Sequence, residues 1–229
     1  NIQWEGEGSP EDPHDAVAAI VAYGDRVVVG GWMGLFVSED AGMSWSSSAL
    51  LPADYLRGLA AVAGVDGEPV VVEGPYASGP IRSLDRGLSW TGQNAGLVDD
   101  NVQEVAADAF DADRLYAVVG HGGFVSGDGG ASWTATDPSE LGQFDVDELE
   151  PGAAWAGGNH GVLLTRDAGE TWDSVAELPA TGHFVAHTRL ADGSDCVATT
   201  GPTEVWCQSG QTWGVVLAAE ERAIGMAGT

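Results

Sequence analysis

The eight residues Ser38-Glu39-Asp40-Ala41-Gly42-Met43-Ser44-Trp45 contain the pattern that decides the fold of this chain. The pattern is a hydroxyl residue, an aspartate two positions later, a glycine, a second hydroxyl residue and a final tryptophan. It returns three times, at Ser83 to Trp90, Ser126 to Trp133 and Thr165 to Trp172. A fifth, altered copy keeps the glycine, the second hydroxyl and Trp213, but has Trp206 for the first hydroxyl and Gln208 for the aspartate. The final tryptophans are 45, 43, 39 and 41 residues apart, and a period near 40 indicates a repeated fold.

Each repeat also contains short runs of valine, alanine and aromatic residues bounded by glycine, aspartate or proline, which is typical of β-strands. In the first repeat, strands are expected at Ala16 to Tyr23, Arg26 to Gly30, Leu35 to Ser38 and from Trp45 onward. In the fourth repeat, Val146 to Leu149 is expected to be the first strand. Solenoid repeats of this period contain helices, so four short strands per repeat predict an all-β fold, the β-propeller.

The repeats cover nearly the whole chain, so residues 1–229 are expected to form one propeller domain. Five blades of four strands each are expected at about 14–50, 51–98, 99–141, 142–180 and 181–221, with 1–13 and 222–229 closing the ring. In that closure, Ile2 to Trp4 would add an outer strand to the last blade. Arg222 to Met226 is similar to another first strand, which leaves a sixth blade, or part of a larger propeller, as the alternative.

The repeated motif has the chemistry of a tight turn. A short aspartate side chain accepts hydrogen bonds from backbone amides two residues on, and glycine adopts the positive φ that such a turn requires. The tryptophan then adds a large apolar surface beside the next blade. The motif residues expected to be structural are Asp40, Trp45, Asp85, Trp90, Asp128, Trp133, Asp167, Trp172 and Trp213.

These motifs resemble the Asp box, or BNR repeat, of sialidases, sortilin-type receptors, xyloglucan-cleaving enzymes, some lectins and photosystem II assembly factors. The resemblance extends from Ser38 to Trp213. It implies that the boxes lie at the periphery of the blades, on the face away from the ligand or catalytic site. The aspartates are therefore expected to form turns and not to act as general acids.

The net charge of −27, from 35 acidic residues and 8 arginines, excludes the functions that need a cationic surface. Binding to a phosphate backbone or to anionic lipid depends on positive side chains that replace counterions. Neither nucleic acid nor a membrane surface is therefore expected as a partner. The longest apolar stretches, such as Ala16 to Tyr23, are too short to cross a bilayer.

Two cysteines, Cys196 and Cys207, lie on either side of Gly201-Pro202. A two-residue hairpin at this turn would place them directly opposite one another, with Val197 opposite Trp206. Opposed Cβ atoms in an antiparallel pair are close enough for a disulfide, which in turn favours a secreted, periplasmic or cell-surface location. A pair of buried free thiols is the alternative.

Candidate binding residues lie in the turns between the second and third strands, on the face opposite the boxes. Five residues before each first hydroxyl stand Met33, Ser78, His121, His160 and, in the altered copy, Gly201. The predicted binding residues are Trp32, Met33, Tyr76, His121, Asn159 and His160. Such a set binds a sugar or a protein through aromatic contacts and hydrogen bonds. Two histidines without a third ligand do not predict a metal site, and no cofactor is expected.

Binding is the expected function and catalysis is not. A sialidase of this class needs three arginines on the substrate carboxylate, and the arginine motif that usually precedes the first box is missing. Paired carboxylates for glycoside hydrolysis carry no information in so acidic a chain. The sequence thus predicts an exported, non-catalytic propeller that binds a protein as a scaffold or assembly module. A lectin-like propeller and a glycoside hydrolase of the Asp-box class are the alternatives.

Overall fold

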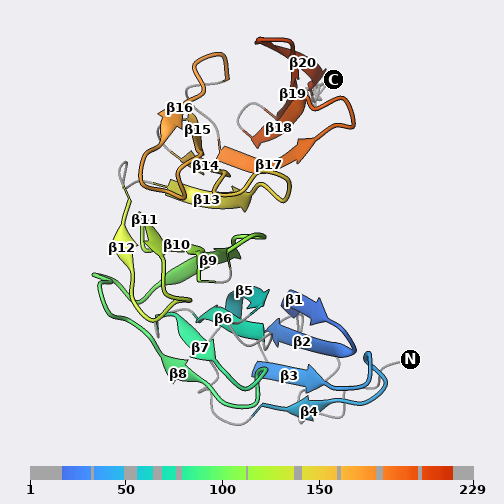
Figure 1. The fold of residues 1–229 in the computed structure, drawn as a ribbon, viewed down its shortest axis with the longest axis vertical. Helices are drawn as coiled ribbons and strands as arrows, with labels where there is room; N and C mark the ends of the chain where they lie inside the picture. The colour runs from blue at the N-terminus through green and yellow to red at the C-terminus, as the bar shows by residue number, and fades with distance from the viewer. Residues whose placement is uncertain are drawn as a thin grey trace, which may run out of the picture.

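The computed structural model describes residues 17–31, 34–48, 56–63, 69–75, 79–111, 113–136, 141–158, 161–178, 183–200 and 203–218. All regular structure in these residues is β-strand, and it forms five four-stranded antiparallel sheets (Figure 1). No helix in this part of the chain is long and apolar enough to span a bilayer.

Each sheet contains four strands that follow one another along the chain. The first sheet contains β1 (Val17–Tyr23), β2 (Arg26–Gly31), β3 (Gly34–Ser38) and β4 (Ser46–Ser47). The second contains β5 (Leu56–Ala63), β6 (Pro69–Pro75), β7 (Ile81–Ser83) and β8 (Thr91–Gly92). The third contains β9 (Val102–Ala107), β10 (Leu115–Val119), β11 (Gly122–Ser126) and β12 (Thr134–Ala135).

The last two sheets have the same strand order. The fourth contains β13 (Leu141–Val146), β14 (Ala154–Gly158), β15 (Gly161–Thr165) and β16 (Asp173–Ser174). The fifth contains β17 (His183–Arg189), β18 (Asp195–Thr200), β19 (Glu204–Ser209) and β20 (Thr212–Ala218).

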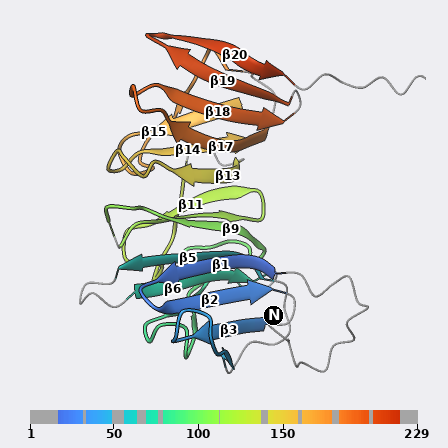
Figure 2. The same ribbon diagram turned by 90° about the vertical axis from the view of Figure 1, so that its right-hand side faces the viewer.

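The sheets follow one another along an arc, with the first two sheets at one end of the long axis of the molecule and the fifth at the other (Figures 1 and 2). Their first strands form the contacts from sheet to sheet, β1 with β5, β5 with β9, β9 with β13 and β13 with β17. Among the described residues no extensive contact joins the first sheet to the fifth, and the two stand at opposite ends of the arc. The segments expected to close a ring, 1–13 and 222–229, lie outside the described residues.

The core lies between neighbouring sheets. Tyr116 and Val118 of the third sheet are fully buried against Phe144 and Leu163 of the fourth, with Trp172 at the edge of the cluster. The Tyr116 and Phe144 rings are 5.7 Å apart between centroids. Each sheet therefore buries its apolar side chains against the next one in the chain, as stacked repeats do.

The first strand of the fourth repeat is Leu141–Val146, so the expected strand from Val146 to Leu149 is wrong. Leu141 and Phe144 are the buried residues of this strand, and an irregularity in pairing between Leu141 and Gln143 interrupts the simple alternation that sequence reading relies on. Beyond Val146 the carboxylate of Asp147 accepts hydrogen bonds from two following backbone amides, which makes this acidic segment a turn.

Candidate functional site

The four complete motifs form the same turn between the third and fourth strands. In the first copy Asp40 Oδ1 accepts hydrogen bonds from the Ser38 hydroxyl at 2.8 Å and the Ser44 backbone N–H at 2.7 Å. The Ser44 hydroxyl donates to Asp40 Oδ2 at 2.6 Å. These bonds, first of all that from the Ser44 hydroxyl, lower the pKa of Asp40 to about 2. The same bonds recur around the aspartates of the other three copies.

The motif turns also connect neighbouring sheets through arginine. The guanidinium of Arg26, in the first sheet, donates to the carbonyl oxygen of Arg86 in the second motif at 2.7 Å. Arg114 of the third sheet donates in the same way to Ala168 of the fourth motif at 3.0 Å. Arg82 of the second sheet donates to Asp128 of the third motif at 3.3 Å. Each complete motif after the first is thus held by a cation of the preceding sheet.

The motif glycine packs directly on the preceding sheet. A Cβ atom added at Gly169 would lie 2.6 Å from Val125 Cγ2 and 3.3 Å from Tyr116 Cε1 of the third sheet. At Gly87 it would lie 3.3 Å from Val37 Cγ2 of the first sheet. Both glycines also have a positive φ. The turn therefore needs glycine for its backbone and for its fit against the neighbouring sheet.

The fifth sheet does not contain the motif turn, and the altered copy forms a short hairpin between its third and fourth strands instead. Strands β19 and β20 are joined at Gly210-Gln211, and Trp206 pairs with Val215 inside the sheet. In the other sheets the first hydroxyl of the motif stands opposite a residue near the start of the second strand, as Ser38 stands opposite Val27. In the fifth sheet Trp206 takes the place of the first hydroxyl and stands opposite Val197, and the neighbouring Cys207 stands opposite Cys196.

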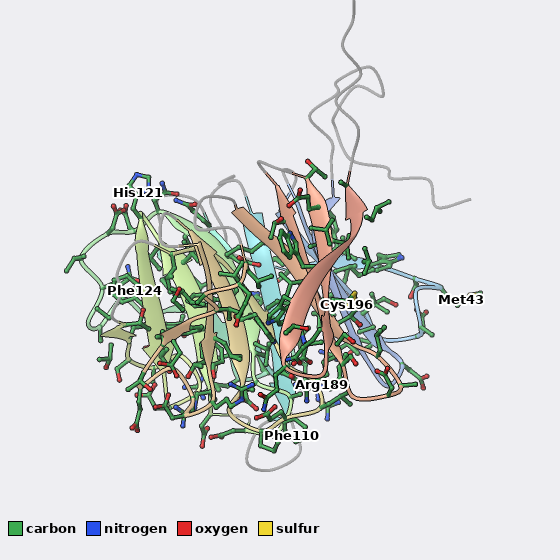
Figure 3. The ribbon with its side chains drawn as sticks, turned by 90° about the horizontal axis from the view of Figure 1, so that it is seen from above. Met43, Phe110, His121, Phe124, Arg189 and Cys196 are labelled. Atoms are coloured by element: carbon green, nitrogen blue, oxygen red, sulfur yellow. A yellow bond between two sulfur atoms is a disulfide. The ribbon has the colours of Figure 1, made fainter. Side chains whose placement is uncertain are left out.

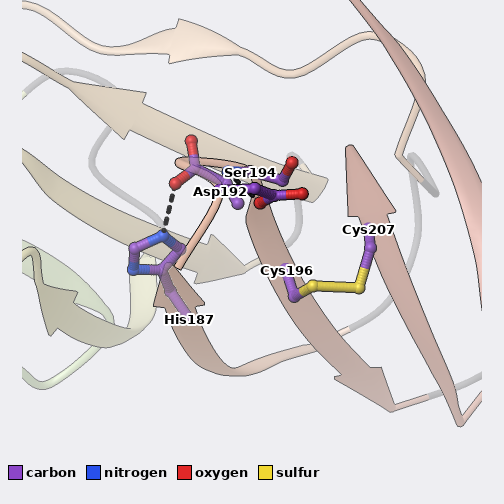
Figure 4. Close-up of a disulfide and its surroundings, with 6 residues drawn as sticks. His187, Asp192, Ser194, Cys196 and Cys207 are labelled. Carbon is purple, nitrogen blue, oxygen red and sulfur yellow. Dashed lines mark hydrogen bonds and ion pairs between the residues drawn. A yellow bond between two sulfur atoms is a disulfide. The ribbon is translucent and has the colours of Figure 1, made fainter. Parts of the chain in front are cut away.

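The predicted disulfide is present between these two cysteines, with Cα atoms 4.1 Å apart (Figure 4). The expected pairing of Val197 with Trp206 is present as well. Trp213 still packs between the fourth and fifth sheets, edge-on to Trp155 with ring centroids 6.1 Å apart. The altered copy has thus kept its tryptophan contact, and the covalent bond lies next to the position that the motif hydroxyl occupies in the other sheets.

A group of charged side chains joins the fourth and fifth sheets near the disulfide. Arg189 donates to Asp195 at 2.7 Å and forms ion pairs with Asp147 at 2.7 Å and Glu150 at 3.1 Å. The His187 ring lies 3.1 Å from Asp195 and stacks on Trp155, with ring centroids 4.6 Å apart. Asp147, His187 and Asp195 offer ligand atoms within 4.8 Å of one another, and Arg189 forms ion pairs with both carboxylates. These side chains form an ion-pair network between the two sheets.

Two carboxylates on the inner strands bind the backbone of the next sheet. Glu104 on β9 accepts a hydrogen bond from the Phe144 N–H at 3.0 Å, and Asp145 on β13 accepts one from the His187 N–H at 2.6 Å. Burial raises the pKa of Glu104 to about 7, and burial likewise raises the pKa of Asp145. Each carboxylate satisfies an amide of the neighbouring inner strand, so both have a structural partner.

Of the predicted binding residues, His121 lies in the described part of the chain. Its side chain is exposed in the turn between β10 and β11. This turn lies at the end of the third sheet opposite the turn that carries Phe110 (Figure 3). The motif turns pack on the Phe110 side, because Gly129 N–H donates to the Asp113 carbonyl in that turn. Outside the described residues lie Trp32, Met33, Tyr76, Asn159 and His160.

An exposed apolar strand at the end of the arc escaped the sequence reading. Val216 and Leu217 on β20 are 63% and 64% exposed, and Val215 is 45% exposed. The outer strands of the other four sheets are two residues long, whereas β20 has seven. The available signal was an unbroken run from Trp213 to Ala218 after the one motif that lacks its aspartate.

No family model matches the chain, and no curated protein matches it. Among solved structures, it is similar to the GH74 xyloglucanase of Xanthomonas campestris, with 22% identity and a TM-score of 0.61 over 84% of this chain and 30% of that one. It is also similar to the extracellular domain of the BT4673 two-component system of B. thetaiotaomicron, with 11% identity and a TM-score of 0.67 over 95% and 30% of the two chains.

The YCF48 protein of Cyanidioschyzon merolae matches with 14% identity and a TM-score of 0.50 over 75% of this chain and 59% of that one. The chain spans 29 to 32% of the length of the GH74 structures that it matches. At these identities the likeness concerns the fold and not the activity. It confirms the all-β propeller fold that the repeated motif predicted.

Proposed function

We propose that this chain is a non-catalytic, exported propeller module that binds a protein partner, as a scaffold or assembly factor, along strand β20. The observation that carries this proposal is the exposure of the apolar residues Val215 to Leu217 on a seven-residue outer strand. A row of exposed valine and leucine side chains on one strand is typical of an interaction surface.

The position of β20 in its sheet defines the mode of binding. It is the outermost strand of the fifth sheet, paired with β19 on one side. A long edge strand presents unpaired N–H and C=O groups that an extended peptide can pair with, and alternate apolar side chains give that pairing its specificity. The net charge of −27 favours a partner segment that carries lysine or arginine.

Export is supported by the disulfide between Cys196 and Cys207, because such bonds persist in oxidising compartments. One similar structure is itself an extracellular domain. A secreted, periplasmic or cell-surface location agrees with both observations.

The test compares capture by the wild-type chain with capture by two variants, Val216→Lys and Val98→Lys. Val98 is 92% exposed in the loop after β8 and serves as the matched control. A protein from the native source should be retained by wild type and by the control, and retained at least ten-fold less by Val216→Lys. In the complex, the amides of β20 should exchange with solvent more slowly than in the free chain.

Equal capture by all three proteins would contradict the proposal. The proposal would also be contradicted if the N-terminal segment of the same chain pairs with β20, since Ile2 to Trp4 was expected to add an outer strand to the last blade. Deletion of residues 1–13 would then speed amide exchange in β20 of the free chain, and β20 would not be the docking site.

A further inference from the structure

A pocket of about 300 Å³ opens between the fourth and fifth sheets. Its wall includes two tryptophans, Trp155 and Trp213, and its rim includes Arg166, Glu177 and Gln208. Asp195 of the ion-pair network also faces it. The volume is at the lower end of the range for small-molecule sites, about 300 to 1,000 Å³.

The pocket lies where the missing motif turn would have packed. In the third sheet the paired residues Tyr116 and Val125 are covered by Gly169 of the next motif. The matching pair of the fourth sheet is Trp155 and Leu164, and both line the pocket. The hairpin glycine of the fifth sheet, Gly210, has no atom within 4 Å of the place where a Cβ would be. The short hairpin thus leaves a pocket beside this buried pair, where the motif turn packs at the preceding boundary.

The polar groups of the pocket include both donors and acceptors. Asp195 and Glu177 offer carboxylate oxygens, while Arg166 and Gln208 offer N–H groups. Trp155 is 1% exposed, and its indole N–H has no acceptor among the described residues. Leaving a buried donor without an acceptor is unfavourable, so a partner for the indole N–H is favoured.

This combination selects among ligand classes. The acidic side chains disfavour an anion. An ammonium group would satisfy the carboxylates but offers no acceptor to the indole or amide N–H groups. A sugar hydroxyl both donates and accepts, and the apolar face of a sugar ring packs on an aromatic side chain such as Trp213. We propose that this pocket binds a neutral sugar residue, independently of the protein partner bound along β20.

The experiment follows the tryptophan indole N–H signals of the ¹⁵N-labelled full chain during titration. The probes are the methyl α- and β-glycosides of glucose, galactose, mannose and xylose, with methylammonium chloride as the cationic probe. Spectra of Trp155→Phe and Trp213→Phe assign the two signals. At least one glycoside should shift both signals in a saturable way.

A blocking variant and its control connect the signal to the pocket. Ser174→Tyr places a ring at the exposed rim of the pocket on β16, and it should weaken the glycoside at least ten-fold. Ala135→Tyr is the matched control at the corresponding exposed position of β12, and it should leave the affinity unchanged. Glu177→Gln should weaken binding by a smaller factor, because an amide oxygen is a poorer acceptor than a carboxylate.

Three results would overturn the proposal. The first is that no glycoside at 50 mM, on the order of the weakest useful affinity, shifts the Trp155 and Trp213 signals in a saturable way. The second is equal binding by Ser174→Tyr and wild type, and the third is tighter binding of methylammonium than of every glycoside. The first result would mean that the pocket holds only solvent, and the third that it binds a cation. Val216→Lys should leave the titration unchanged, so failure of the β20 site does not count against the pocket.

Discussion

The fourth and fifth sheets have the same strand order but differ in how the third strand turns into the fourth. In the fourth sheet the motif turn from Thr165 to Trp172 packs on the third sheet, and its outer strand is two residues long. In the fifth sheet a tight hairpin replaces the motif turn, a disulfide joins the second and third strands, and the outer strand has seven residues. The motif therefore closes its own sheet and also covers the preceding one. The disulfide joins the second and third strands of the fifth sheet, so it does not take the place of the missing turn over the fourth sheet. The pocket and the exposed strand both occur at this sheet.

The largest loss of stability is expected for Gly169→Ala, which disturbs the motif turn that packs on the third sheet. A left-handed backbone costs an alanine about 1 to 2 kcal/mol, and contact with Val125 at 2.6 Å adds overpacking of about 1 to 3 kcal/mol. Gly210→Ala has the backbone cost alone, because no atom lies within 4 Å of its Cβ position. Urea unfolding should show a loss of about 3 kcal/mol for the first variant and about 1 kcal/mol for the second. Equal losses would mean that the two hairpins pack alike.

Removal of the disulfide between Cys196 and Cys207 should cause the next largest loss of stability. The disulfide joins residues 11 positions apart, and a loop of that size is stabilised by roughly 2 to 3 kcal/mol through the unfolded state. The double variant Cys196→Ser and Cys207→Ser should lose about this much in urea unfolding. Hydrogen exchange should rise in β17 to β20 and stay unchanged in β9 to β12. A rise throughout the molecule would contradict a local role.

Glu104, on the inner strand β9, predicts that the stability of the fold changes with pH. The folded-state pKa of Glu104 is about 7 against an ordinary 4.5, so the folded chain holds this proton more tightly. Stability from this group is complete below pH 4.5 and is lost as the pH rises to 7. Glu104→Gln keeps an acceptor for Phe144 and should stabilise the chain at pH 8 by about 1 to 2 kcal/mol, with no gain at pH 4. Glu170→Gln, at an exposed motif position, is the control, and a gain at both pH values would point to another cause.

The smallest effect is expected for the motif carboxylate itself. Hydrogen bonds, first that from the Thr171 hydroxyl, lower the pKa of Asp167 from 3.8 to about 2. Its stabilisation is present above pH 3.8 and is lost as the pH falls to 2. Asp167→Asn should therefore lower the melting temperature modestly at pH 7 and by less at pH 2.5. A difference that grows in acid would show that the charge is not what holds the turn.

The features that sequence predicted best are those contained in a short segment. The turns around Asp40, Asp85, Asp128 and Asp167 are closed by bonds spanning four residues or fewer, and the Cys196–Cys207 bridge lies within one hairpin. Each can be inferred from spacing alone.

The features that it did not predict depend on contacts between sheets. The start of β13 follows an irregular pairing with β14, and the pocket exists because the fourth sheet lacks a covering turn from the fifth. Neither relation is local in sequence. The binding face around Trp32, Tyr76, His121 and His160 stays a prediction, since most of it lies outside the described residues.

The arginines that join sheet to sheet have a consequence for the response to ionic strength. All eight cations of the chain are arginines, and Arg26, Arg82, Arg114 and Arg189 are engaged with carbonyls or carboxylates inside the fold. With 35 acidic residues against eight arginines, the chain carries a large excess of negative charge that repels itself. Salt shortens the screening length from about 10 Å at 0.1 M to about 3 Å at 1 M, which weakens this repulsion more than the partly buried contacts. We therefore expect the melting temperature to rise with sodium chloride. Such a rise would show that ions from the solvent, and not these arginines, screen the negative charge of the surface.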